Sequence, residues 1–156
     1  MRDEIQRWDW KNWSELSRDT LYEILMLRQA IFVVEQECPY LDTDGQDQFA
    51  GHVLGRSNQH VLLGYSRVFL PKSDGQSAVI GRVIVHPKVR GQGIGYELMR
   101  QSEVLAIAYC DHRIHSFSLS AQAHLQHFYG QLGYEITGPG YDEDGIPHLP
   151  MQKNLE

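Results

Sequence analysis

The 156-residue chain has only two cysteines and no long apolar run. Cys38 and Cys110 lie far apart in unlike contexts, so neither a redox pair nor a zinc knuckle is indicated, and reduced thiols are expected. No stretch approaches the roughly 18 consecutive apolar residues typical of a membrane-spanning helix, and the first residues lack the apolar core of a signal peptide. The sequence therefore predicts a cytoplasmic protein without a membrane partner.

The chain also has no excess of basic residues. Twenty Asp and Glu residues outnumber 14 Lys and Arg residues, which gives a formal net charge of −6. Because a phosphate backbone is bound by a basic stripe, this balance argues against a nucleic-acid partner. Acidic residues gather within 35–47 and 142–144. Two such loop-like segments facing one cleft would attract an amine, but solvation of surface loops explains them equally well.

The eight histidines do not have the spacing of metal ligands. On the strand expected there, His112 and His115 would face opposite sides of a sheet. His124 and His127 would share a helix face, but no cysteine or carboxylate lies nearby at ligand spacing. We therefore expect no metal site.

The most informative segment is 82–95, in which a β-branched strand passes through a turn into a glycine-rich loop. Three glycines alternate there: Gly91, Gly93 and Gly95. An apolar pattern at helical spacing follows, so the glycines should lie at a helix N-terminus, where amide groups and the macrodipole favour an anion. Tyr96 stands where a dinucleotide-binding fingerprint needs a third glycine, and no P-loop Gly-Lys-Ser or Gly-Lys-Thr follows. The segment predicts a phosphate-bearing cofactor, with a ligand-free turn as the alternative.

The elements expected around this loop form a mixed order. Apolar periodicity predicts, in turn, a helix over 21–34 capped by Ser17, an antiparallel meander over 52–55, 60–70 and 78–85, a helix over 96–109, a strand over 114–119, a helix over 123–132 ended by Gly133, and a strand from 134. This order indicates a single mixed α/β domain over 1–156. The N-terminal tryptophans Trp8, Trp10 and Trp13 suit an edge strand with a core anchor or a contact in a homodimer, and we favour the core.

Five segments resemble a known family. The loop 90–95 is similar to the acetyl-CoA pyrophosphate loop of the GNAT superfamily of N-acetyltransferases, and 28–36 resembles its Arg-x-x-Val-Phe-Val-x-Glu-Gln stretch. The segment 128–134 resembles the family's Phe-Tyr-x-x-x-Gly-Phe, with Tyr in place of the last Phe. The segments 38–42, followed by an Asp at 47, and 144–148 resemble the ElaA-like branch in particular.

The resemblance implies the GNAT fold, in which the meander is followed by a βαβ-type CoA-binding unit, and acetyl-CoA as the cosubstrate. Strand backbone at Val83, Ile84 and Val85 would pair with the pantetheine arm. Backbone amides would bind the pyrophosphate at Gly91, Gln92, Gly93, Ile94, Gly95 and Tyr96. Arg90 would contact the pyrophosphate or fix the loop. Gln122 stands where many members carry a pantetheine-binding asparagine, and it could make that contact only from a different backbone offset.

The same resemblance assigns chemistry to Tyr129, which corresponds to the tyrosine that protonates the departing CoA thiolate. A phenol with a pKa of about 10 is protonated at neutral pH and is close enough in acidity to a thiol, at about 8.5, to donate its proton late in the reaction. The alternative is an aromatic residue that packs in the core beside Phe128.

The general base has no motif, because the strand before the glycine loop lacks the glutamate that some members use. Five side chains at loops or strand ends are candidates: His148, Glu143, His52, Glu37 and Asp44. Of these we put His148 forward as the base candidate.

The predicted function is transfer of the acetyl group to a primary amine of a small molecule or peptide. Direct attack is expected, since neither cysteine lies in the glycine loop or the Tyr129 motif. A small amine, a polyamine, an amino sugar, a peptide N-terminus and a protein lysine all suit an acidic cleft. A non-catalytic module that binds acetyl-CoA, as a sensor or a partner-binding protein, is the alternative function.

Overall fold

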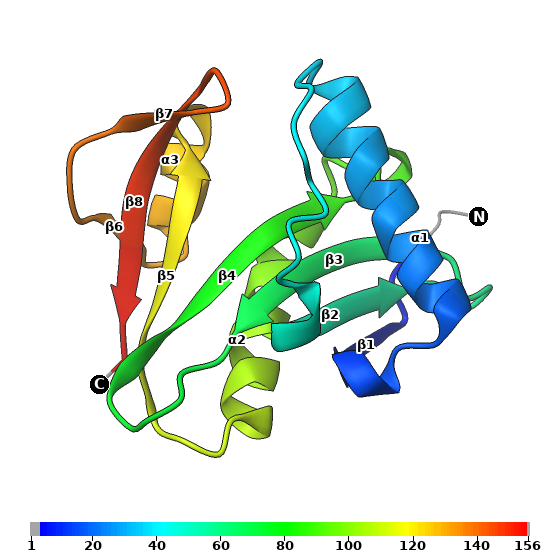
Figure 1. Cartoon of the computed structure of the whole chain (residues 1–156), viewed down its shortest axis with the longest axis horizontal. Coiled ribbons are helices and arrows are strands. Elements are labelled where there is room, and N and C mark those ends of the chain that lie inside the picture. Colours follow the sequence, from blue (N-terminus) through cyan, green and yellow to red (C-terminus); the bar gives the residue numbers. More distant parts are fainter. Residues whose placement is uncertain (1–3, 156) are drawn as a thin grey trace.

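The structure is a computed structural model that describes residues 4–155, and its centre is an eight-stranded mixed sheet (Figure 1). The strands follow the order β1-β2-β3-β4-β5-β8-β6, and β7 pairs with β8. Their bounds are β1 Arg7–Asn12, β2 Gly51–Arg56, β3 Leu62–Phe69, β4 Gln76–Val85, β5 Ile114–Gln122, β6 Glu135–Ile136, β7 Tyr141–Glu143 and β8 Ile146–Asn154. The helices are α1 Arg18–Arg28, a π-helix Gln29–Glu35, α2 Ile94–Tyr109 and α3 Gln126–Gln131. The predicted mixed α/β architecture, a meander followed by a βαβ-type unit, is confirmed.

The N-terminal tryptophans lie on and beside an edge strand, β1, which pairs with β2. The Trp10 ring is buried and stacks on Tyr109 at a centroid distance of 5.8 Å. Gly51 of β2 lies directly beneath it, since a Cβ there would approach the Trp10 ring to 1.8 Å. The preference for a core anchor is therefore confirmed for Trp10, while Trp13 stays 40% exposed.

The first helix begins as predicted and ends differently. The Ser17 hydroxyl accepts a hydrogen bond from the backbone N–H of Thr20, which caps α1. The expected α-helix over 21–34 is wrong in its second half, because the chain widens into the π-helix at Gln29. The β-branched run in that half loses side-chain freedom in an α-helix, and π-helical turns often occur at functional sites.

Strands β4 and β5 are parallel neighbours only over their first halves. Their pairing runs from Gln76 to Val79 on β4 and ends at Ser118 on β5. Beyond this point the two strands diverge, as Figure 1 shows. A β-bulge accompanies the divergence, because the register with β3 shifts next to Arg82, whose φ is +51°. After Val79, the edge of β4 on the β5 side consequently has no strand partner within residues 4–155, whereas the opposite edge still pairs with β3.

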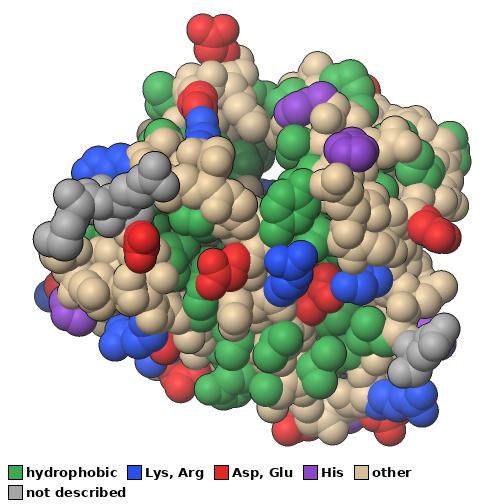
Figure 2. Space-filling view, turned by 180° about the vertical axis from the view of Figure 1, so that it is seen from behind, with side chains coloured by type: hydrophobic (Ala, Val, Ile, Leu, Met, Phe, Trp, Pro, Cys, Tyr) green, Lys and Arg blue, Asp and Glu red, His purple; other side chains and the backbone are tan. Residues whose placement is uncertain are grey.

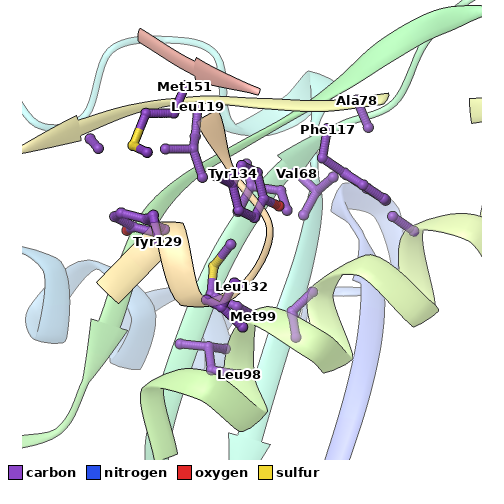
Figure 3. Close-up of a cluster of buried hydrophobic side chains, with 14 of the residues drawn as sticks. Val68, Ala78, Leu98, Met99, Phe117, Leu119, Tyr129, Leu132, Tyr134 and Met151 are labelled. Carbon is purple, nitrogen blue, oxygen red and sulfur yellow. The ribbon is translucent and has the colours of Figure 1, made fainter. Parts of the chain in front are cut away.

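The sheet carries a different helix layer on each face. Helices α2 and α3 cover one face, where the larger core forms (Figure 3). The labelled members of this core come from the strands of the sheet and from the helices that cover them, including the residues just after α3: Val68, Ala78, Leu98, Met99, Phe117, Leu119, Tyr129, Leu132, Tyr134 and Met151. Helix α1 packs on the other face through a smaller cluster that includes Ile24, Ile31, Leu54, Tyr65 and Ile84.

The C-terminal part departs most from the sequence prediction. The expected helix over 123–132 divides into a 3-10 turn at Ala123–Leu125 and the short α3, and Gly133, with φ +98°, follows it. The prediction of a loop over 142–144 is wrong for the first two residues, which belong to β7. This strand forms a hairpin with β8 through a turn at Asp144 and Gly145, whose φ angles are +51° and +84°. Strand β8 then continues alongside β5 to Asn154. Within residues 4–155, no helix has both the length and the apolar character required to cross a membrane.

Candidate active site

A cavity of about 1050 Å³ occupies the gap between the diverging halves of β4 and β5. The space-filling view shows the surface hollowed between two lobes (Figure 2). The cavity is lined by every predicted cofactor residue except Gln92, namely Val83, Ile84, Val85, Arg90, Gly91, Gly93, Ile94, Gly95, Tyr96 and Gln122. Gln92 is exposed beside it. Segments that are distant in the sequence thus meet around one space.

The glycine loop leads directly into α2. Gly91 and Gly93 have φ angles of +78° and +75°, and a Cβ at either position would meet nothing within 4 Å. Glycine is needed there for its left-handed backbone. Gly95 differs, because a Cβ at this position would lie 3.1 Å from the Phe128 ring, so this glycine allows α2 to pack closely on α3. No described side chain caps α2 at Gly93, which leaves its first-turn amides available to an anion.

Arg90 fixes the loop to two neighbouring elements. Its Nη1 and Nη2 donate to the Glu35 carboxylate at 2.5 and 2.8 Å, and its Nε donates to the Val85 carbonyl oxygen at 3.3 Å. The guanidinium lowers the pKa of the Glu35 carboxyl. The loop-fixing role expected for Arg90 is present, while its contact with a pyrophosphate stays a prediction.

Tyr129 is both a core residue and a wall of the cavity. Its ring is 7% exposed and meets Phe128 edge-on at a centroid distance of 4.9 Å. Among residues 4–155, no side chain or backbone group forms a hydrogen bond with its hydroxyl. Burial raises the pKa of Tyr129 to about 12.

His148 lies on β8, opposite Gln122 of β5, and lines the same cavity. Its Nδ1 is 2.7 Å from the carbonyl oxygen of Ile146 and its Nε2 is 3.2 Å from a carboxylate oxygen of Glu143. Because the Ile146 oxygen can only accept, Nδ1 is the donor in that contact, and Nε2 faces the Glu143 carboxylate. The Tyr141 ring stacks on the imidazole at 6.1 Å and orients it.

The other candidate bases are less suited to the task. Asp44 lines the cavity, but its hydrogen bonds from Arg67 outweigh the opposing effect of burial and hold the pKa of its carboxyl at about 2. His52 and Glu37 do not line the cavity. The His52 ring is fully buried between the Tyr65 hydroxyl and the Asp47 carbonyl oxygen, and burial lowers its pKa.

The two acidic segments face one cleft, as expected, since Glu35, Asp44, Glu143 and Asp144 all line the cavity. Most carboxylates of segment 35–47 are held in ion pairs, so plain solvation does not describe this segment. Arg28, fully buried, binds Asp42 at 2.9 Å and Asp47 at 2.6 Å. Arg67 binds Asp44 and Asp47, at 2.9 and 3.0 Å, and Arg82 binds Asp42 at 2.8 Å. We call these three arginines and three aspartates the arginine–aspartate network. It ties α1, β3 and β4 to the loop that closes one side of the cavity.

Comparison with known proteins agrees with this geometry. The family model described as an acetyltransferase (GNAT) domain matches residues 22–155. Protein ElaA of Escherichia coli (strain K12) is 42% identical over 151 residues, which cover 95% of this chain and 96% of that protein. The chain belongs to the GNAT acetyltransferase family.

Two solved structures show which members of the GNAT family this chain resembles in fold and sequence. The crystal structure of Escherichia coli ElaA superposes with a TM-score of 0.84 at 40% identity, covering 95% of this chain and 99% of that one. An acyl-CoA N-acyltransferase from Pseudomonas aeruginosa superposes with a TM-score of 0.82 at 38% identity, covering 94% and 99%. The ElaA-like resemblance is confirmed, and these relationships identify the chain as an acetyl-CoA-dependent acyltransferase.

Two residues on the cavity wall of this GNAT protein, Cys38 and Gln36, were given no role from the sequence. Cys38 is buried there, and its thiol donates a hydrogen bond to the Asp144 carbonyl oxygen at 3.3 Å. Gln122 donates to the Gln36 side chain at 3.3 Å. Both contacts join the end of the π-helical segment to the β5–β8 side across the cavity. The 38–42 and 144–148 motifs signalled these regions, but no local pattern shows that they touch.

No group of three or more His, Cys, Asp or Glu side chains is positioned to hold a metal ion within the part of the chain that the structure describes. His112 lies 3.7 Å from Asp74, and the pair belongs to turns at the opposite end of β4 from the glycine loop.

Proposed function

We propose that this acyltransferase moves the acetyl group of acetyl-CoA to a primary amine by direct attack, with Tyr129 as general acid and His148 as general base. The observation that carries the proposal is that both side chains line one cavity together with the glycine loop. Acetyl-CoA supplies the activated acetyl group as a thioester.

The residues at the mouth of the cavity suit this cosubstrate. The edge of β4 that lacks a strand partner offers backbone groups at Val83 and Val85 to the amide groups of a pantetheine arm, as an added strand would use them. The Val85 carbonyl oxygen also accepts a hydrogen bond from Arg90 and would share its second lone pair. The uncapped N-terminus of α2 offers amides and a positive dipole end to a pyrophosphate. The left-handed Gly91 and Gly93 turn the chain so that no side chain covers that helix end.

Tyr129 would donate its hydroxyl proton to the sulfur as the C–S bond breaks. A pKa of about 12 keeps the phenol protonated at neutral pH. The burial that raises this pKa also disfavours a bare thiolate in the same cavity, so the proton affinity of the sulfur rises in parallel. With no hydrogen-bond partner among the described residues, the hydroxyl is free to turn toward the sulfur.

His148 would prepare the nucleophile. An amine is protonated at neutral pH, and Nε2 of a neutral His148 would accept one of its protons. The Ile146 carbonyl oxygen and the Glu143 carboxylate, each within hydrogen-bond distance of one ring nitrogen, would stabilise the imidazolium that results. The neutral amine then forms the N–C bond as the C–S bond breaks. The sulfur takes the Tyr129 proton, the second proton lost by the nitrogen returns to the Tyr129 oxygen, and the products are an amide and CoA.

The test is Tyr129→Phe, with Tyr22→Phe as the control, since Tyr22 is 69% exposed on α1 and lies outside the cavity. CoA release and acetyl-amine formation are followed by chromatography. We expect Tyr129→Phe to lower kcat by about 10²- to 10⁴-fold, as loss of a general acid does. The dissociation constant of acetyl-CoA should not change, because binding is assigned to the backbone of β4 and the glycine loop.

Full activity of Tyr129→Phe would remove the tyrosine from the mechanism. A wild-type protein that binds acetyl-CoA and acetylates no amine would instead favour the alternative, a module that binds acetyl-CoA without turnover.

A further inference from the structure

The proposed function leaves one wall of the cavity for the acceptor. On β5, Leu119 and Ala121 belong to the core under α2 and α3, so Ser120 and Gln122 face the α1 side of the sheet. His148 lies opposite Gln122 in an antiparallel pair, and its side chain therefore shares that face. Tyr129 belongs to the α2 and α3 side. An acceptor approaching from the α1 side would meet His148 without crossing the cosubstrate elements.

The α1-side wall has a large apolar surface. Its apolar members come from the 36–44 loop, the end of β3, the point on β4 where its pairing with β5 stops, and the β7–β8 hairpin: Tyr40, Leu41, Phe69, Val79 and Ile146. Leu41 is 77% exposed and Val79 is 42% exposed, although both line the cavity. Apolar surface open to a cavity is covered when an apolar group enters it.

The polar side chains of this wall are largely engaged with one another. Ser120 forms a hydrogen bond with the Tyr141 hydroxyl, and Gln122 with Gln36. The one buried polar atom of the described residues without a hydrogen-bond partner is Nε of Arg67, which also lines the cavity. A ligand with several hydroxyl groups would find this single free donor and would have to break protein contacts to be recognised further.

The carboxylates that line the cavity differ in whether an arginine pairs with them. Glu35 is paired with Arg90, and Asp44 with Arg67. Glu143 and Asp144 remain, adjacent at the tip of one hairpin. The Glu143 side chain is 53% exposed and faces His148, and no described residue forms an ion pair with Asp144. Negative charge is thus available at one end of the α1-side wall only.

We infer that the acceptor is a monoamine with an apolar body, whose ammonium group binds at Glu143 and Asp144 and whose body covers Leu41, Phe69 and Val79. The inference rests on the proposed function and deepens it. A polyamine would place further ammonium groups against paired carboxylates or apolar wall, and an amino sugar would place hydroxyl groups there. On binding, the polyamine and the amino sugar would each bury a polar group without a hydrogen-bond partner, which costs free energy.

The experiment measures dissociation constants calorimetrically for four amines with the CoA-saturated protein: 2-phenylethylamine, spermidine, glucosamine and a lysine-containing peptide. We expect 2-phenylethylamine to bind at least about tenfold more tightly than the others, within the range that a hydrophobic pocket discriminates. Initial acetylation rates for the same four amines should follow the same order.

Two variants locate the subsite. Leu41→Ser should weaken 2-phenylethylamine by about three- to tenfold, since it removes one apolar contact, and should not change the binding of ethylamine, which is too short to reach that side chain. Val104→Ser is the matched control, because Val104 is 60% exposed on α2, outside the cavity. Glu143→Gln should weaken both amines alike.

The outcomes separate the two proposals. Tighter binding of spermidine, glucosamine or the peptide, or equal effects of Leu41→Ser and Val104→Ser, would overturn the inferred acceptor class while acetyl-CoA turnover stood. Preferential binding of 2-phenylethylamine without acetylation would instead uphold the subsite and count against the proposed transferase chemistry.

Discussion

The Cys38 thiol shows how a single residue can join a site without a local signal. It lies on the cavity wall because the chain after the π-helix passes the tip of the β7–β8 hairpin, 106 residues further along the sequence. From the sequence it stood outside both the glycine loop and the Tyr129 motif. Its hydrogen bond runs to a carbonyl oxygen, which does not act as a base, so the thiol lacks the partner that activates a nucleophilic cysteine.

We therefore expect Cys38→Ala to keep kcat within about tenfold of the wild-type value, since loss of a covalent nucleophile costs several orders of magnitude. Steady-state acetylation of an amine measures this, and mass spectrometry of the protein mixed with acetyl-CoA detects any acetyl-cysteine. A loss of a thousandfold together with an acetylated Cys38 would replace direct attack by a two-step transfer.

Other residues could be assigned from the sequence because their chemistry is local. The glycines after β4 were predictable, since backbone conformation and the following helix lie within one short segment. Tyr129 was predictable only through a resemblance, because a tyrosine beside Phe128 on an apolar face is equally typical of a core. Tyr129 is buried in the core and also lines the cavity, so its position is compatible with both descriptions.

At the scale of elements, the arginine–aspartate network holds the 36–44 loop against the α1 side of the sheet. Its aspartates lie in one loop, but its arginines come from α1, β3 and β4. The sequence shows the acidic cluster and not its partners, because pairing depends on how three elements pack. This is why the segment 35–47 was open to interpretation as an amine-attracting or solvated loop.

We expect Arg28→Ala to destabilise the protein by about 3–5 kcal/mol, because it leaves the carboxylates of Asp42 and Asp47 buried without their main partner. Urea unfolding followed by circular dichroism measures the change. Arg7→Ala is the control, since the Arg7–Asp9 pair is exposed and such pairs contribute about 0–1 kcal/mol. Equal losses for the two variants would show that the network does not hold the loop.

At the scale of the whole molecule, the order of elements was more predictable than their ends. Apolar periodicity located the meander, both main helices and β5, because each buries one face in a core. It did not separate the π-helix from α1, and it missed β7 and β8, whose polar residues at 141–143 and prolines at 147 and 150 hide the alternation of a strand. Strand β8 is stabilised by pairing with β5, which is a long-range contact.

Stability should fall in alkali because of buried tyrosines. Burial raises the pKa of Tyr129 to about 12 and also raises those of Tyr65 and Tyr134, whereas tyrosines in the unfolded chain titrate near about 10. The folded state therefore holds these protons more tightly, and the stability they contribute is complete below about pH 10 and decreases as the pH rises toward about 12. Urea midpoints at increasing pH measure this decrease, and Tyr129→Phe should make it smaller. A midpoint that does not change above pH 10 would contradict the account.

In acid the sign is opposite. The lowered pKa values of Asp44, at about 2, and of Glu35 and His52 mean that the folded state releases these protons more readily than the unfolded chain. The stability from His52 is lost as the pH falls below about 6.5, and that from the carboxyl groups as it falls below about 4. We expect maximal stability between about pH 7 and 9, measured by the same urea midpoints. Stability that increased on acidification from pH 7 to 4 would be inconsistent with these shifts.

The most direct test of the cavity as an acetyl-CoA site is calorimetric titration of acetyl-CoA into the wild-type protein, Gly93→Glu and Gly75→Glu. The two glycines have φ angles of +75° and +79° and open space around a Cβ, so glutamate strains the backbone alike at both positions. Only Gly93 lines the cavity. We predict that the wild-type protein and Gly75→Glu bind acetyl-CoA and that Gly93→Glu does not. A folded wild-type protein without binding, or equal binding by the two variants, would contradict the assignment of the glycine loop.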